Sequence, residues 1–193
     1  MNRFFTFIFI ICFLPVLAQE SFYDPNSYST SKDDLFIDTK GLFNILKTPD
    51  HEILGIFVLS TDCPISQKYI KKIKTLSSTY DDRVSFYFFL TKNTTNSEKV
   101  NFEKDYEIDF KLKIDKKNKL SKLIGASVTP EAFLICRDSG KILFHGAIDN
   151  WFYSLGKKRS VITANYFEDA LKQLLNNEKI RVPFAQPVGC YIE

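Results

Sequence analysis

The pattern of apolar and polar positions predicts a strand followed directly by a helix in the first half of the chain. Residues 53–59 form a near-continuous apolar run of strand length. Apolar side chains then recur at helical spacing over 65–76, with lysines mostly on the opposite face, which predicts a helix that runs to about Tyr80. Cys63 stands between the two, so it is expected where a buried strand ends and a helix begins.

The rest of the chain predicts further strands and helices in alternation. Four stretches have the residue types and length of strands, namely 35–38, 84–90, 110–114 and 132–136. Three amphipathic stretches predict helices, at 97–108, 115–124 and 165–175. A turn at 138–140 leads into a returning strand over 141–145, and 147–164 reads as a long loop.

Cap residues mark the ends of two of these helices. Ser97 is expected to cap the first and Asp115 the second, which Gly125 would end. Residues 41–46 fit either a further strand or a helical turn. Early alternation with an antiparallel pair late in the chain predicts an α/β fold, a mixed central sheet with helices on both faces.

The N-terminus has the organisation of a secretory signal. Arg3 supplies a positive charge, an apolar stretch follows to Leu17, and Ala18 is a small residue at the expected cleavage site. The apolar stretch is shorter than a stable membrane span needs. We therefore predict a signal peptide over 1–18, cleavage near Ala18 and export to the periplasm or the cell exterior. Residues 19–34 are a polar lead-in, and 35–193 form one domain with a tail from about residue 181.

Charge and cysteine content narrow the class of function. The chain has 26 basic and 23 acidic residues, a net charge of +3 that falls to +2 without Arg3 and is too small to imply nucleic acid as a partner. Cys12 would leave with the signal, so the mature chain keeps Cys63, Cys136 and Cys190. With an odd number of cysteines, at least one thiol is free or pairs only transiently.

Cys63 is the best candidate for chemistry. The N-terminus of a helix stabilises a thiolate, and Pro64 suits the first helical turn because its missing N–H would have no partner there. The alternative is a small, inert cysteine that ends a core strand. Cys136 ends an apolar strand and is expected to face the core as a structural thiol.

Three motifs carry a resemblance to a known group. They are D-C-P-I-S at 62–66, T-P-E-A-F at 129–133 and V-G-C-Y-I at 188–192. With them, residues 35–193 resemble exported thioredoxin-like proteins of the redoxin, or AhpC/TSA, group. The resemblance implies a thioredoxin-like fold in which Thr129 and a cis Pro130 face Cys63 and shape a groove for an extended substrate. It does not imply a particular substrate.

The resemblance has one departure that matters for chemistry. Ser66 stands where thioredoxins carry a second cysteine, so it can donate a hydrogen bond to a thiolate but cannot resolve a mixed disulfide. Our hypothesis is that Cys63 attacks and Cys190 resolves, with Gly189 giving the backbone freedom to approach. A free Cys190 or a static Cys63–Cys190 bond remains open. Protein thiols or disulfides are the expected partners. An external thiol reductant is also needed, because no cofactor or metal site is expected.

Three other classes compete with this hypothesis. Ser60 and Pro64 match the surroundings of a peroxiredoxin cysteine, which would make peroxide the substrate, but Ile56 replaces the upstream proline and Arg159 is only a candidate to steady the thiolate. Cys63, Cys190 and His145 would suit copper(I), although no close-spaced ligand pair supports it. A binding module without catalysis would use the loop aromatics, which are Trp151, Phe152 and Tyr153.

Overall fold

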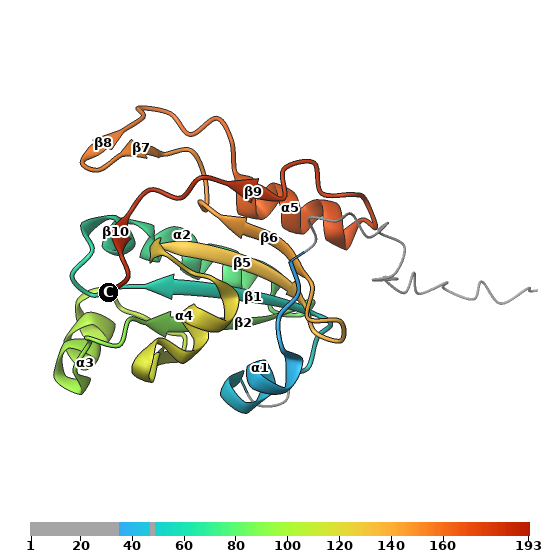
Figure 1. Ribbon diagram of the computed structural model, residues 1–193. Coiled ribbons are helices and arrows are strands. Elements are labelled where there is room, and N and C mark those ends of the chain that lie inside the picture. The colour runs from blue at the N-terminus through green and yellow to red at the C-terminus, as the bar shows by residue number, and fades with distance from the viewer. Residues whose placement is uncertain (1–34, 47–48) are drawn as a thin grey trace, which may run out of the picture.

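A mixed six-stranded sheet forms the centre of the molecule. The computed structural model describes residues 35–46 and 49–193, so the predicted signal and polar lead-in lie outside the described residues. The strand order is β3-β2-β1-β5-β6-β9 (Figure 1). These strands are β1 (Ile53–Leu59), β2 (Val84–Leu90), β3 (Leu112–Ile114), β5 (Glu131–Cys136), β6 (Ile142–Gly146) and β9 (Phe184–Ala185).

The strand pairings confirm the predicted mixed sheet. Parallel pairing joins β1 to β2, β2 to β3 and β6 to β9. Antiparallel pairing joins β1 to β5 and β5 to β6. The central strand β1 therefore has one parallel and one antiparallel neighbour, and its carboxyl end carries the segment with Cys63.

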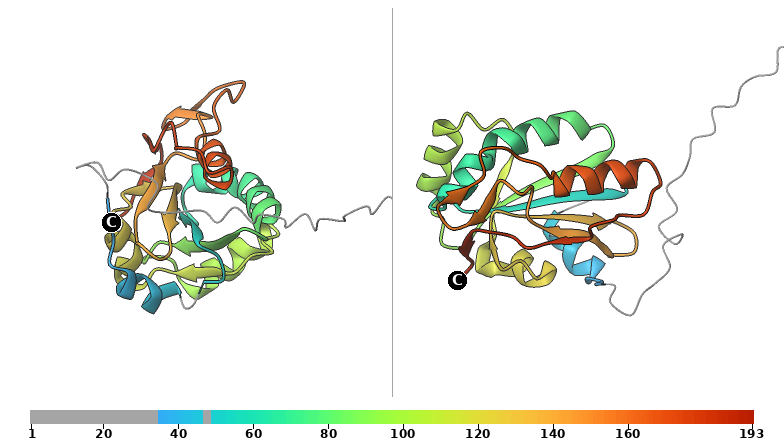
Figure 2. Two further views of the ribbon diagram at one scale, coloured as in Figure 1. Left: turned by 90° about the vertical axis from the view of Figure 1, so that its right-hand side faces the viewer. Right: turned by 90° about the horizontal axis from the view of Figure 1, so that it is seen from above.

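Helices cover both faces of the sheet, as predicted (Figures 1 and 2). One face packs against α2 (Pro64–Tyr80), α3 (Asn96–Asp105) and α5 (Tyr166–Leu175), and the other against α1 (Thr39–Leu46) and α4 (Lys119–Ile124). Alternate residues of β1 serve the two cores: Phe57 packs on Phe167 of α5, whereas Ile56 faces the α1 and α4 side. Because both faces are covered, every residue of β1 is buried, which explains its near-continuous apolar run.

Several predicted elements are confirmed, and others need correction. The strands at 53–59 and 84–90 and the helices that follow Cys63 and Asn165 lie where the pattern places them. Residues 41–46 belong to helix α1, whereas the strand predicted at 35–38 is reduced to a single bridge from Phe36.

The helix predicted at 97–108 begins earlier and ends earlier than expected. It spans Asn96–Asp105, and Thr95 rather than Ser97 caps it. Thr95 and Glu98 form a reciprocal capping box, in which each side chain accepts a hydrogen bond from the other residue's backbone N–H. The T-x-x-E spacing of Thr95 and Glu98 predicts this cap, and it is a stronger cap signal than the serine two residues after Thr95.

The helix predicted at 115–124 is shorter than expected and spans Lys119–Ile124 as α4. A 3-10 turn over Lys116–Asn118 precedes α4, and the Asp115 carboxylate accepts hydrogen bonds from the backbone N–H groups of Leu120 and Ser121. Gly125 ends the helix in the left-handed conformation, as predicted.

The long loop and the tail contain short strands that the pattern misses. A small hairpin of β7 (Phe152–Ser154) and β8 (Lys157–Lys158) lies within 147–164. In the tail, β9 joins the sheet beside β6, and β10 (Cys190–Tyr191) pairs with β4 (Val128–Thr129). Within the described ranges, no helix is long and apolar enough to cross a membrane.

Candidate thiol site

Cys63 lies at the junction of the central strand and the longest helix. It is the N-cap residue of α2, with extended backbone, and Pro64 occupies the first helical turn. A turn brings the Cys63 N–H within 3.3 Å of the Ser60 carbonyl oxygen. Although it sits at a loop, the Cys63 side chain is only 1% exposed.

Two distant segments meet the sulfur of Cys63. The Cys63 thiol donates a hydrogen bond to the Thr129 carbonyl oxygen, with 3.0 Å between the atoms. The Cys190 thiol donates to the Cys63 sulfur, and the two sulfur atoms are 3.1 Å apart. The Thr129–Pro130 peptide bond that follows is cis. The structure therefore brings Cys63, Thr129, Pro130 and Cys190 together.

Hydrogen bonds to Cys63 favour its thiolate form. Burial raises the pKa of the Cys63 thiol, but hydrogen bonds from the Cys190 side chain, from the Ser66 and Cys190 backbones and from the Ser66 hydroxyl lower it. The balance leaves the pKa of Cys63 below its ordinary value. Ser66 is fully buried one turn into α2, and its hydroxyl also accepts a hydrogen bond from the Ser60 N–H at 3.3 Å.

Cys190 has the opposite character. Burial, together with its hydrogen bond to Cys63 and the charge of the Cys63 thiolate, raises the pKa of Cys190 to about 11. Cys190 is therefore protonated at neutral pH and donates to Cys63, which is the sulfur of the pair that ionises first as pH rises. Because thiolates are the nucleophiles in disulfide exchange, Cys63 is the more reactive member of the pair.

The tail reaches Cys63 by adding a short strand to β4. Cys190 is the register partner of Thr129, and the Ile192 N–H donates to the Ser127 carbonyl oxygen at 2.9 Å. Gly189 lies so close to Thr129 that an added Cβ would overlap the Thr129 carbonyl group. In Figure 1 the red tail runs from β9, at the edge of the sheet, to β10 and ends near the carboxyl end of β1.

The other predicted side chains lie further from the sulfur chemistry. Arg159 follows β8, where its guanidinium lies 5.2 Å from the Tyr153 ring centre and donates to the Asn150 carbonyl oxygen. It borders a cavity of about 390 Å³ rather than contacting Cys63. The Ser60 hydroxyl accepts from the Asp62 N–H at 3.4 Å, so it shapes the turn before the cysteine. Cys136 is buried in the core, as expected.

Glu131 is a buried residue that the sequence reasoning did not single out. Its carboxylate accepts hydrogen bonds from the backbone N–H groups of Ser127 and Val128, at 2.9 and 3.4 Å, and lies 3.8 Å from the imidazole of His145. These contacts hold the segment before Pro130 in place. An acidic residue at the start of an apolar strand, in T-P-E-A-F, was the available signal.

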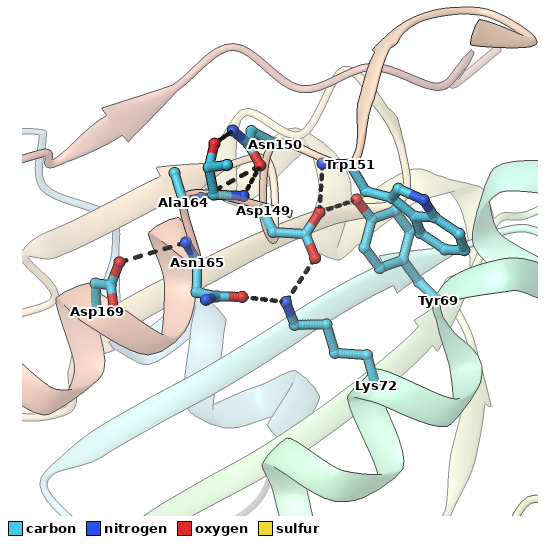
Figure 3. Close-up of polar contacts among 9 residues, drawn as sticks. Tyr69, Lys72, Asp149, Asn150, Trp151, Ala164, Asn165 and Asp169 are labelled. Carbon is cyan, nitrogen blue, oxygen red and sulfur yellow. Dashed lines mark hydrogen bonds and ion pairs between the residues drawn. The ribbon is translucent and has the colours of Figure 1, made fainter. Parts of the chain in front are cut away.

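A buried carboxylate ties α2 to the segment that carries the β7–β8 hairpin (Figure 3). Asp149 accepts hydrogen bonds from the Tyr69 hydroxyl, from the Trp151 N–H at 2.8 Å and from the Lys72 ammonium at 2.5 Å. Lys72 also donates to the Asn165 side chain at 2.6 Å. Burial and the nearby Asp149 carboxylate raise the pKa of Tyr69. Asp149 thus links α2, the helix that Cys63 caps, to the segment between β6 and β7.

The residues considered as copper(I) ligands, Cys63, Cys190 and His145, do not form one cluster in the described part of the chain. No group of three or more His, Cys, Asp or Glu side chains among the described residues is placed to hold a metal ion. His145 instead lies between the rings of Phe133 and Phe184, with ring centres 6.0 and 4.8 Å away.

The sheet order, the two helical layers and the cysteine opposite a cis-proline segment define a thioredoxin-like fold. Comparison with solved structures agrees. An uncharacterised conserved protein from Geobacillus kaustophilus is similar over 77% of this chain and 80% of its own, with 17% identity and a TM-score of 0.63. A hypothetical protein from Sinorhizobium meliloti is similar over 82% of this chain and 90% of its own, with 19% identity and a TM-score of 0.62.

A third similar structure is described as a thioredoxin. It is a protein from Neisseria meningitidis, with 16% identity, a TM-score of 0.51 and coverage of 65% of this chain and 76% of its own. No family model and no curated protein matches the sequence. At these identities the comparisons show the fold, and the chemistry has to be argued from the thiol pair.

Proposed function

We propose that this chain is a thiol-disulfide oxidoreductase in which Cys63 is the nucleophile and Cys190 the resolving thiol. The observation that supports this most is the 3.1 Å separation of two sulfur atoms whose residues are 127 positions apart, combined with their opposite pKa shifts. A cysteine that merely packs in a core has no reason to face a second thiol in this way.

The exchange proceeds in two balanced steps. The Cys63 thiolate attacks one sulfur of a substrate disulfide, forms a mixed disulfide and releases the other substrate sulfur as a thiolate. Cys190 then loses its proton to that leaving thiolate and attacks the Cys63 sulfur. The Cys63–Cys190 disulfide forms, the mixed disulfide bond breaks, and the second substrate sulfur is released as a thiolate. Two electrons have passed to the substrate, and an external thiol reductant returns them to the protein.

The remaining site residues support these steps. The Ser66 hydroxyl and backbone N–H stabilise the Cys63 thiolate, and Thr129 and Pro130 form the wall that an extended substrate would meet. Protein disulfides are the proposed substrates. The motifs at 62–66, 129–133 and 188–192 support placing the chain in the redoxin group, and the N-terminal pattern supports export.

Peroxide reduction has weaker support in the site. Ser60 and Pro64 match a peroxiredoxin cysteine. The described residues that hydrogen-bond to the Cys63 sulfur are Ser66, Thr129 and Cys190, and none of them is an arginine. A peroxidase would form a sulfenic acid at Cys63 with stoichiometric peroxide. This outcome is distinguished in the experiment below.

Trapping with a disulfide tests the proposal. The reduced chain is mixed with a small disulfide such as hydroxyethyl disulfide, and the products are mapped by mass spectrometry after alkylation. We expect a reversible Cys63–Cys190 link in the unaltered chain, a persistent mixed disulfide on Cys63 in Cys190→Ser, and neither product in Cys63→Ser. Cys136→Ser is the matched control and should behave like the unaltered chain, because that thiol is buried in the core.

Two outcomes would contradict the proposal. If Cys63 and Cys190 never link and Cys190→Ser accumulates no mixed disulfide, Cys63 is not an exchange nucleophile. If Cys63 instead forms a sulfenic acid with peroxide and ignores disulfides, the protein is a peroxidase.

A further inference from the structure

The edge of β4 beside Cys63 is occupied by the chain's own tail. Cys190 pairs with Thr129, the Thr129 hydroxyl donates to the Cys190 carbonyl oxygen at 3.5 Å, and Ile192 bonds to Ser127. Further on, the Asn118 side-chain amide donates to the Glu193 carbonyl oxygen at 2.6 Å. The last residues of the tail are thus held by a short antiparallel pairing at Cys190–Tyr191, by the Ile192 bond and by the Asn118 side chain.

This arrangement covers the sulfur that is to react. Cys63 is buried, whereas Cys190 is only half-buried and lies directly against it. A disulfide from outside has to approach the Cys63 sulfur in line with the bond that breaks. With the tail in place, Cys190 is the more exposed member of the pair and Cys63 the buried one. The docked arrangement is therefore closed to exchange with an extended substrate.

Gly189 explains which strands fit this edge. A Cβ at this position would overlap the carbonyl oxygen and carbon of Thr129. The segment before Pro130 is held independently of the tail by the Glu131 carboxylate, which accepts from the Ser127 and Val128 N–H groups. The two residues after Cys190 do not restrict the side chain so strongly. The Tyr191 side chain is 83% exposed, and the Ile192 side chain is partly buried against the core. A strand that places a cysteine opposite Thr129 therefore needs glycine immediately before it.

From this geometry we infer that the β4 edge is a binding site for extended segments with a Gly-Cys pair, and that residues 188–193 are its resident occupant. The inference rests on the proposed function and defines its substrate class. A protein substrate carries a cystine whose near cysteine follows glycine in an extended segment. It pairs with β4 only after the tail leaves, and the Cys63 thiolate then attacks the substrate sulfur that lies opposite Thr129.

Two matched peptides test the selectivity of this site. They are P-V-G-C-Y-I-E and P-V-A-C-Y-I-E, each with its cysteine activated as a mixed disulfide with pyridine-2-thiol. Attack by Cys63 forms the protein–peptide disulfide and releases pyridine-2-thione, whose absorbance gives the rate. Dipyridyl disulfide serves as a small probe that reports the reactivity of Cys63 without strand pairing.

The full-length variants are Cys190→Ser, which keeps the tail docked, and Gly189→Ala with Cys190→Ser, which expels it. In the double variant we expect the glycine peptide to react about tenfold faster than the alanine peptide, and about tenfold faster than it does in Cys190→Ser. Gly156→Ala with Cys190→Ser is the control for a strained glycine replacement. Its φ of +72° strains an alanine at the β7–β8 turn, but the added Cβ meets nothing within 4 Å and the turn belongs to a different sheet from the β4 edge. This variant should react like Cys190→Ser alone.

A second variant releases the tail by a different change, so the test does not depend on the folding of the Gly189→Ala protein. Asn118→Gly with Cys190→Ser removes the contact to Glu193 and suits the positive φ of 52° at that residue. It should also react faster with the glycine peptide than Cys190→Ser does. Equal rates for the two peptides, together with normal reaction of dipyridyl disulfide, would overturn the inference and leave the proposed function intact. Failure of Cys63 to react with any of the three disulfides would instead contradict the proposed function.

Discussion

At the scale of single residues, the two thiols differ because their surroundings differ. Cys63 accepts hydrogen bonds and sits at a helix N-terminus, whereas Cys190 donates and faces the charge of its neighbour. As pH rises, Cys63 therefore loses its proton first, below the ordinary value of 9.0, and Cys190 loses its proton at about 11. Disulfide exchange should accordingly gain rate as pH rises through the pKa of Cys63 and level off above it.

Ser66→Ala tests the cause of this shift. Losing the hydroxyl removes one hydrogen bond to the thiolate, so we expect the pKa of Cys63 to rise toward its ordinary value and the rate profile to move to higher pH. The measurement is an NMR titration of the cysteine Cβ shifts. Ser78→Ala, in the same helix but exposed and bonded to Thr75, should leave the titration unchanged. An unshifted Cys63 in Ser66→Ala would show that the hydroxyl does not stabilise the thiolate.

At the scale of secondary-structure elements, Asp149 joins α2 to the segment before α5. Asp149→Ala would remove the acceptor of the Tyr69 hydroxyl and the ion-pair partner of the Lys72 ammonium, which would keep only its hydrogen bond to Asn165. We expect a loss of about 2–3 kcal/mol in the free energy of unfolding, somewhat less than for a fully buried pair because the Lys72 side chain is 23% exposed.

Urea denaturation measures this loss. Asp82→Ala removes an exposed carboxylate at the end of the same helix and should change stability by less than about 0.5 kcal/mol. Equal stabilities of the two variants would mean that the Asp149 network contributes nothing to the packing of the two elements.

The elements also show what sequence can and cannot predict. The run at 53–59 is buried on both faces and the run at 84–90 is buried or partly buried throughout, so their apolar composition marks both as strands of the central sheet. The strands β7 to β10 have two or three residues each, too few to show any period. The odd number of cysteines and the neighbouring Gly189 indicate Cys190 as a candidate thiol. Its place opposite Thr129 depends on backbone pairing, which no pattern of side chains predicts.

At the scale of the whole molecule, the thiol pair joins the first half of the chain to its tail. A Cys63–Cys190 disulfide would close a loop of 127 residues and restrict the unfolded chain. For loops of this size the chain-entropy estimate is roughly 4–5 kcal/mol, so the oxidised protein should be more stable than the reduced one by up to about that amount.

Urea unfolding of the oxidised and reduced protein measures this difference. Cys190→Ser cannot form the link, so oxidising and reducing conditions should give it the same midpoint. If the oxidised unaltered chain is no more stable than the reduced one, forming the disulfide must distort the tail or its groove, and ready reversal of the bond would follow.

The position of β10 also sets an order of assembly. Cys190 lies C-terminal to the other strands that the structure describes, so it is synthesised after the residues of β1, α2 and β4 that surround Cys63. During synthesis and folding, Cys63 therefore passes through a stage in which its final partner has not yet arrived. In that interval the nascent protein is open to capture by other thiols, and correct maturation depends on a late, short segment displacing them.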